Sequence, residues 1–206
     1  MKFRIIKEKN PVNDEYKVNL LYRAVGSGLF TGYIPIASGT FGALLAMLIF
    51  LLPGFEQYSS LLIAVPLSFL AGAFASEKMR PRYGDDPPEA VIDEVCGMWF
   101  TYLIGLLIFD IFFTAKPFNP FTKNPILFKF LGLSIEITHK RVFAVVAFLM
   151  FRLFDILKLQ PAKYIDENMK SGWGIMLDDI AAGFYAGILS PVITHFLWFR
   201  IIIHTF

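Results

Sequence analysis

The chain alternates between apolar stretches and short polar clusters. None of the stretches is a clean run of about 20 apolar residues, the length that a lone membrane-spanning helix needs. No segment shows the two-residue alternation that is typical of a β-strand. The pattern therefore predicts an all-α fold, a compact polytopic bundle of helices in a membrane. The five stretches are Phe41–Pro53, Leu61–Ala75, Val95–Phe109, Val142–Phe151 and Ile180–Ile203.

Polar residues gather at one set of ends of these stretches. They precede the first, third and fifth stretches and follow the second and fourth. If each stretch crosses the bilayer once, this alternation brings every cluster to the same membrane face, and we expect a carboxylate-rich site there. The clusters are Ser27/Ser38/Thr40, Glu77–Asp86, Asp93/Glu94, Arg152–Lys158 and Asp178/Asp179.

Composition supports a membrane protein. The 206 residues are 56% hydrophobic and only 17% charged, whereas a soluble domain usually carries about 25% charged residues. The net charge of +2 is too small to indicate nucleic acid as a partner. The first 25 residues contain no apolar run, so we expect no cleavable signal peptide. We divide the chain into a polar leader, 1–25, and a membrane-embedded domain, 26–206.

The distribution of basic residues predicts the orientation. Of the 19 Lys and Arg residues, 13 lie on the side of the polar clusters, which favours a cytoplasmic location for that side. The 116–141 connection is an exception, because five basic residues fall on the opposite side. Its Phe121–Ile137 segment looks amphipathic, and we expect it to lie along the membrane surface.

Two pairs of neighbouring acids are candidate metal ligands. Asp93 and Glu94 lie where a helix enters the third stretch, and an ionised carboxylate at membrane depth is costly unless it is paired, solvated or bound to metal. Asp178 and Asp179 repel each other unless a cation or a proton relieves them. Oxygen ligands of this type suit Mg²⁺. The alternative for both pairs is a helix-terminal charge or cap.

A third group combines both signs of charge. Arg152, Asp155 and Lys158 are spaced by three, so they share one face of a helix. This arrangement suits metal and phosphate binding, although a ladder of salt bridges within the helix is the alternative. Gly39 and Thr40 precede the first stretch, where backbone N–H groups at a helix start can bind an anion.

Two sequences predict helix starts. Ser38 has the hydroxyl side chain of an ordinary N-cap. The Asp86-Pro87-Pro88-Glu89 sequence resembles a capping box, with Asp as N-cap, Pro at the first helical position and Glu at the third. A further helix, from Ile180, contains a Gly183–Gly187 pair of small residues that predicts close approach of a neighbouring helix.

Several kinds of chemistry are excluded or disfavoured. The single cysteine, Cys96, lies among apolar residues and excludes an internal disulfide. The three histidines are scattered, and there is no glycine-rich nucleotide-binding loop. A divalent-cation transporter remains an alternative, because acids within membrane segments also mark ion pathways. Against it, the acids cluster at the ends of the stretches and paired repeats are absent.

Four motifs together resemble the phosphatidylglycerophosphatase A family. They are GSGLFTGYIPIASGTFGALLA, VIDEVCGMW, FRLFDILK and SGWGIMLDDIAAGFYAGIL, and they occur in the family's order between Gly26 and Leu189. Two positions depart from the family pattern: Ser38 replaces the Pro of Pro-Gly-Thr, and Leu159 replaces the Pro of Lys-Pro. Neither departure removes a carboxylate.

The resemblance implies a Mg²⁺-dependent, multi-pass enzyme of a bacterial-type inner membrane, with its active site facing the cytoplasm. It implies hydrolysis of phosphatidylglycerophosphate in the bilayer to phosphatidylglycerol and inorganic phosphate. A phosphatase of another lipid phosphomonoester, such as phosphatidate, is the nearer alternative. The sequence does not indicate the oligomeric state.

We hypothesise a role for each candidate residue. Carboxylates bind the metal, and a subset of them, Asp93, Glu94, Asp155 and Asp179, takes part in catalysis, including as a base for water. Basic side chains and the turn before the first stretch hold the phosphate. The metal ligands are Asp93, Glu94, Asp155, Asp178 and Asp179, and the phosphate-binding residues are Arg152, Lys158, Gly39 and Thr40.

Overall fold

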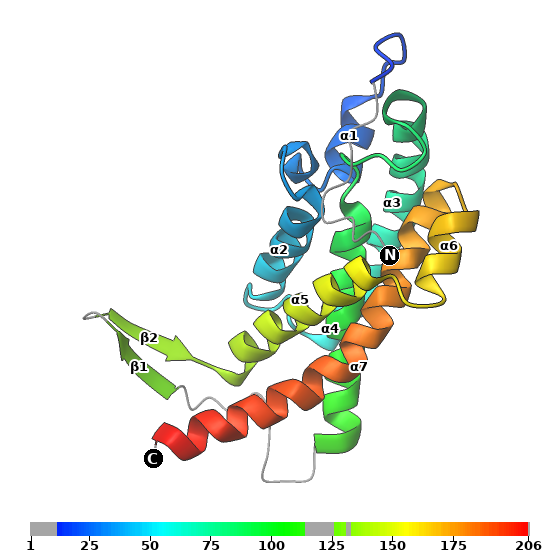
Figure 1. The fold of residues 1–206 in the computed structure, drawn as a ribbon. Helices are drawn as coiled ribbons and strands as arrows, with labels where there is room; N and C mark the ends of the chain where they lie inside the picture. The colour runs from blue at the N-terminus through cyan, green and yellow to red at the C-terminus, as the bar shows by residue number, and fades with distance from the viewer. Residues whose placement is uncertain (1–11, 114–125, 131–132, 206) are drawn as a thin grey trace.

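The computed structural model describes residues 12–113, 126–130 and 133–205. Within them the chain is almost entirely helical, as predicted (Figure 1). The elements are α1 (Leu20–Gly26), the 3₁₀ turn η1 (Thr31–Tyr33), α2 (Ser38–Phe50), α3 (Tyr58–Tyr83), α4 (Ile92–Phe113), β1 (Ile126–Phe130), β2 (Leu133–Ile137), α5 (His139–Leu157), α6 (Ala162–Asn168) and α7 (Gly172–Thr205).

Helix α4 is the centre of the bundle and contacts α2, α3, α5 and α7 (Figure 1). Its closest partner is α7, and the predicted pair of small residues explains the approach. A Cβ atom on Gly183 would come within 2.6 Å of the Gly97 carbonyl oxygen, and one on Gly187 within 2.7 Å of the Ile104 Cβ atom. Side chains larger than glycine would therefore push α7 away from α4.

An aromatic cluster fixes α2 and α5 against α4. The ring of Phe50 stacks on that of Tyr102 with centroids 3.8 Å apart, and Phe143 packs its edge against Tyr102 at 5.7 Å. The buried Tyr102 hydroxyl donates a hydrogen bond to the Ala144 carbonyl oxygen at 3.1 Å. Burial of these rings is a large apolar contribution to packing, so the end of α2 and the first turns of α5 are held against the middle of α4.

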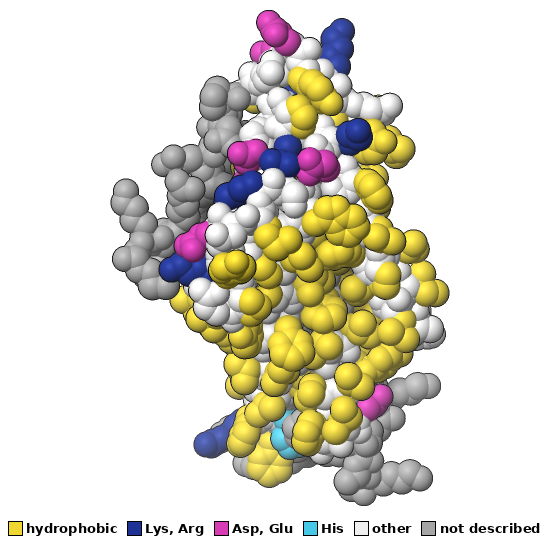
Figure 2. All heavy atoms as spheres, turned by 90° about the vertical axis from the view of Figure 1, so that its right-hand side faces the viewer, with side chains coloured by type: hydrophobic (Ala, Val, Ile, Leu, Met, Phe, Trp, Pro, Cys, Tyr) yellow, Lys and Arg dark blue, Asp and Glu magenta, His cyan; other side chains and the backbone are white. Residues whose placement is uncertain are grey.

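In the part of the chain that the structure describes, three helices are long and apolar enough to cross a membrane: Tyr58–Tyr83, Ile92–Phe112 and Gly172–Arg200. Helix α2, with 13 residues, is shorter. Large apolar side chains are exposed along the outer faces of α3, α4 and α7 (Figure 2). Charged side chains in that view concentrate above the apolar band. The chain is a membrane protein built as a helical bundle.

A two-stranded antiparallel hairpin, β1–β2, corrects the expectation that the chain has no strand. Ile126 pairs with Ile137 at its open end. The sequence LSIEI alternates apolar and polar residues, the strand signal that was missed. The rest of the predicted surface segment, 121–125 and 131–132, lies outside the described residues, as does the first part of the polar leader, 1–11.

Both predicted helix starts are wrong in detail. Ala37, with φ 51°, is the N-cap of α2 and makes no side-chain cap, while the Ser38 hydroxyl donates to the Pro88 carbonyl oxygen at 2.8 Å. Helix α4 starts at Ile92, and the preceding Pro87 accepts a turn hydrogen bond. At the start of α2 a contact with the segment before α4 replaces the predicted local cap, and before α4 the predicted capping sequence forms a turn instead.

Candidate active site

Five helix ends meet at one end of the bundle: the starts of α2, α4 and α7 and the ends of α3 and α5. Glu77 of α3 accepts a hydrogen bond from the backbone N–H of Gly172 at 2.7 Å, which joins α3 to α7. Lys158 at the end of α5 lies 3.0 Å from Asp178 of α7. The polar clusters that are distant in sequence therefore lie together, as their positions at the ends of apolar stretches predicted.

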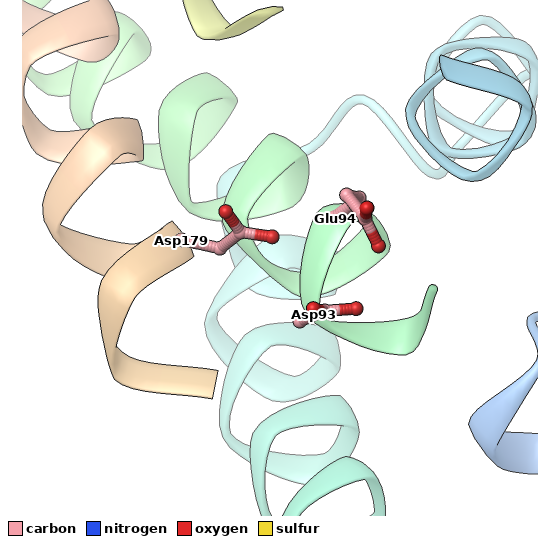
Figure 3. A group of neighbouring side chains, drawn as sticks. All are labelled: Asp93, Glu94 and Asp179. Carbon is pink, nitrogen blue, oxygen red and sulfur yellow. The ribbon is translucent and has the colours of Figure 1, made fainter. Parts of the chain in front are cut away.

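Three buried carboxylates form the centre of this end. Asp93 and Glu94 lie in the first turn of α4, and Asp179 reaches toward them from α7 (Figure 3). One oxygen of each lies within 4.8 Å of the others. The residues are only 3–4% exposed. Burial of so much negative charge is unfavourable without a compensating cation.

The donor set of this group fits Mg²⁺. All three side chains offer carboxylate oxygens, the hard ligands that Mg²⁺ prefers. The Glu94 Oε2 atom is buried and has no hydrogen-bond partner in the described part of the chain. A buried, unsatisfied carboxylate oxygen is costly, and a bound cation would relieve that cost.

The neighbouring acids of α7 point to different partners. Asp179 belongs to the three-carboxylate group, whereas the Asp178 Oδ2 atom lies 3.0 Å from the Lys158 Nζ atom. Successive residues of a helix are about 100° apart around its axis, so the pair is divided between two neighbourhoods. Asp178 therefore lies beside the three-carboxylate group and pairs with Lys158.

Arg152 lies beside the three carboxylates. Its Nη1 atom lies 2.6 Å from the Asp155 Oδ2 atom, one helical turn along α5. The guanidinium also interacts electrostatically with Glu94, Asp179 and Asp93. Its buried Nε atom has no hydrogen-bond partner among the described residues. The Arg152 guanidinium is therefore attracted to the carboxylates and still has its Nε–H group to donate to a ligand.

Gly39 lies directly against Glu94 and Arg152. A Cβ atom at this position would overlap the Glu94 Oε1 atom and lie 3.2 Å from the Arg152 Nη1 atom. The absence of a side chain thus permits the start of α2 to close over the site. The neighbouring Thr40 donates its backbone N–H to the Ala37 carbonyl oxygen at 2.9 Å, and its predicted role in phosphate binding stays a prediction.

Lys158 is shared by two carboxylates. Its Nζ atom lies 2.8 Å from the Asp166 Oδ1 atom and 3.0 Å from Asp178. Burial disfavours the charged amine, but Asp178 and Asp166 outweigh that effect and raise the pKa of Lys158 above its ordinary value. Lys158 is therefore a permanent cation.

A small cavity opens beside the acids. Asp93 and Asp178 form one side of it, and the loop before α4 and the α6–α7 connection form the rest. Asp166 lines this cavity too, and sequence reasoning missed it because α6 carries no recognisable motif. The cavity is lined by Asp85, Asp86, Asp93, Asp166, Met169, Lys170, Gly174, Ile175 and Asp178.

Comparison with known proteins assigns the chain to a family. Residues 24–194 match the family model described as phosphatidylglycerophosphatase A. The chain belongs to the phosphatidylglycerophosphatase A family. All the carboxylates described above lie within the matched residues. Membership confirms that the protein is a phosphoric monoester hydrolase, a lipid phosphatase of the membrane.

Curated relatives align with this member of the phosphatidylglycerophosphatase A family over most of its length. A Bacteroides thetaiotaomicron protein named putative phosphatidylinositol-3-phosphatase is 33% identical over 173 residues, covering 82% of this chain and 90% of the relative. Haemophilus influenzae phosphatidylglycerophosphatase A is 31% identical over 196 residues, covering 92% and 98%. The Escherichia coli phosphatidylglycerophosphatase A is 26% identical over 185 residues, covering 89% and 90%. No solved structure matches the chain.

Proposed function

We propose that this protein hydrolyses the terminal phosphomonoester of phosphatidylglycerophosphate in a Mg²⁺-dependent reaction. The products are phosphatidylglycerol and inorganic phosphate, so the enzyme serves phospholipid biosynthesis. The observation that carries this proposal is the buried group of Asp93, Glu94 and Asp179, placed at the end of a membrane bundle within the family's matched region.

The three carboxylates would hold the metal. Bound Mg²⁺ supplies charge stabilisation for the phosphoryl group and lowers the pKa of a bound water. Asp93 lines the cavity beside the acids, and a carboxylate there accepts a proton from water. Asp155 pairs with Arg152 and interacts electrostatically with Asp179, and its predicted roles as a metal ligand and in catalysis stay predictions.

Arg152 would bind the phosphate. Its guanidinium interacts with the carboxylates of the group, and its Nε donor is buried without a hydrogen-bond partner among the described residues. Arginine donors match the geometry of phosphate oxygens. Lys158 lies further from the group, against Asp178, and adds positive charge that offsets the surrounding acids.

The site lies where a lipid headgroup can reach it. The acyl chains would remain against the apolar band of the bundle, while the phosphomonoester enters among the helix ends (Figure 2). The excess of basic residues on that side of the chain, 13 of 19, supports a cytoplasmic active site in an inner membrane.

The test is phosphate release by purified protein in detergent micelles. Phosphatidylglycerophosphate, phosphatidate and phosphatidylinositol 3-phosphate are supplied separately, each with Mg²⁺ or with EDTA. The third lipid is included because of the name of the Bacteroides relative. We expect phosphatidylglycerophosphate to be the preferred substrate and EDTA to abolish turnover. Preference for another lipid would contradict the proposed substrate, and turnover in EDTA would contradict the metal.

A further inference from the structure

Asp166 lies outside the four family motifs, yet it is joined to the site. It belongs to the short helix α6, and its Oδ1 atom lies 2.8 Å from the Lys158 Nζ atom. The same Nζ atom lies 3.0 Å from the Asp178 Oδ2 atom. One ammonium group thus bridges α6 and α7, and the two carboxylates compete for it.

The position of Lys158 is fixed by the backbone. Lys158 is the C-cap of α5, with φ 44° in the left-handed region, and its N–H donates to the Phe154 carbonyl oxygen at 2.9 Å. Its side chain therefore starts from a defined point, between α6 and α7. The side chains of the three charged groups are 30% (Lys158), 33% (Asp166) and 12% (Asp178) exposed, so water screens them only in part.

We propose that Asp166 is a positioning residue that holds the Lys158 ammonium group between its own carboxylate and that of Asp178. Because Lys158 then neutralises Asp178 only in part, Asp166 sets the relative strength of cation and phosphate binding at the site. The inference rests on the proposed function, because it takes Mg²⁺ and phosphate as the two ligands. Asp178 lines the same cavity as Asp93. The negative charge that Lys158 leaves unneutralised on Asp178 therefore acts on ligands at the three-carboxylate group.

Neutralising Asp166 has opposite consequences for the two ligands. Lys158 would then pair with Asp178 alone, and the neighbourhood would lose one negative charge. A cation is held less strongly by the less negative site, whereas an anion is repelled less. A general loosening of the structure would instead weaken both kinds of binding. The two explanations are therefore distinguished by the direction of the change.

The experiment compares Asp166→Asn with Glu167→Gln, the matched control on the same helix. Glu167 is 58% exposed in its side chain and lies 3.9 Å from Lys163, away from Lys158. Mg²⁺ alone and inorganic phosphate alone are titrated calorimetrically into purified, detergent-solubilised protein. For Asp166→Asn we expect the Kd of Mg²⁺ to rise about three- to tenfold and that of phosphate to fall by about the same factor, as expected for removal of a partly screened charge. Glu167→Gln should change neither.

Asp166→Glu, which keeps the charge, should restore values close to those of the unmodified protein. Asp166→Ser replaces the Asn variant if the latter does not yield folded protein, judged by its thermal transition. The inference is overturned if both constants are unchanged or both bindings weaken. If the unmodified protein binds no Mg²⁺, the proposed function fails as well, whereas normal Mg²⁺ binding with no opposite shifts removes the inference alone.

Discussion

The two ends of the bundle handle buried polar groups in different ways. At the end away from the site, Lys140 lies 3.1 Å from Glu56 and 5.8 Å from the centre of the Phe50 ring. The imidazole of His139 packs between Phe109 and Trp198, with ring centroids 5.1 and 5.4 Å away. Among the described residues at that end, the Lys140 ammonium thus has a carboxylate partner of opposite charge.

At the site, carboxylates outnumber the cations that serve them. Arg152 and Lys158 face acids from α4, α5, α6 and α7. Two like charges 4 Å apart repel by about 4 kcal/mol at the effective dielectric constant of a protein surface. A fold that needed only stability would match these charges, as the Lys140–Glu56 pair does. The excess of negative charge supports the proposed cation site.

Removal of one carboxylate from the site should give the largest effect. Asp179→Asn deletes a charge from the group of three without changing its size, and we expect kcat to fall by about 100-fold or more, since a metal site depends on each of its ligands. Phosphate release at saturating Mg²⁺ measures this fall in kcat. Asp110→Asn, an exposed acid near the other end of α4, is the control and should retain full activity. Near-normal turnover of the Asp179 variant would remove that residue from the mechanism.

Two glycines, one at the site and one in the core away from it, give a second contrast. Gly39→Ala places a methyl group against Glu94 and Arg152, whereas Gly105→Ala places one within 2.5 Å of the Phe143 ring. We expect Gly39→Ala to lower kcat/KM by about 10- to 100-fold, because misplaced catalytic groups are costly. Gly105→Ala should instead lower the free energy of unfolding by about 1–3 kcal/mol through overpacking.

Activity per folded molecule separates the two glycine variants, with the folded fraction taken from denaturant unfolding. The Gly105 variant should keep nearly all of its activity per folded molecule, and the Gly39 variant should not. Equal losses of activity per folded molecule in both would show that the site is no more sensitive to spacing than the rest of the core.

The smallest effects are expected at two acids that join segments. Glu77 accepts the Gly172 N–H and pairs with Arg80 at 2.9 Å, while Glu56 pairs with Lys140. Replacement of either by Ala should cost about 1 kcal/mol of unfolding free energy, since both are partly exposed. Only Glu77→Ala should also lower kcat/KM, by about three- to tenfold, because α7 carries Asp179.

Glu77→Gln keeps an oxygen that accepts the Gly172 N–H, so it should recover most of that activity. Chemical denaturation and phosphate release, measured on the same preparations, check both expectations. An equal loss of activity in Glu56→Ala would show that the effect is general destabilisation rather than displacement of α7.

The convergence of the acids could be predicted from the sequence because it follows from alternation. Asp93, Arg152 and Asp179 each adjoin an apolar stretch, and the direction of the chain reverses between stretches. This reasoning requires only the ends of helices, not their exact packing. The family motifs added the reaction type, which the comparisons confirm.

The partners of each side chain could not be predicted in the same way. Asp178 and Asp179 are adjacent in sequence, and only the rotation of α7 against α4 decides which of them joins the three-carboxylate group. Gly39 is explained by contact with Glu94 across two helices. Asp166 has no local signal, since its role depends on where α6 folds back. Such features arise from tertiary packing, which local patterns do not encode.

The order of the elements has a consequence for biosynthesis. Asp179 is supplied by α7, which follows every other described element, while its partners Asp93 and Glu94 begin α4. A polypeptide still attached to the ribosome before α7 is made has only two of these three carboxylates. If the three carboxylates hold the metal, as proposed, hydrolysis starts only after α7 has inserted and packed against α4.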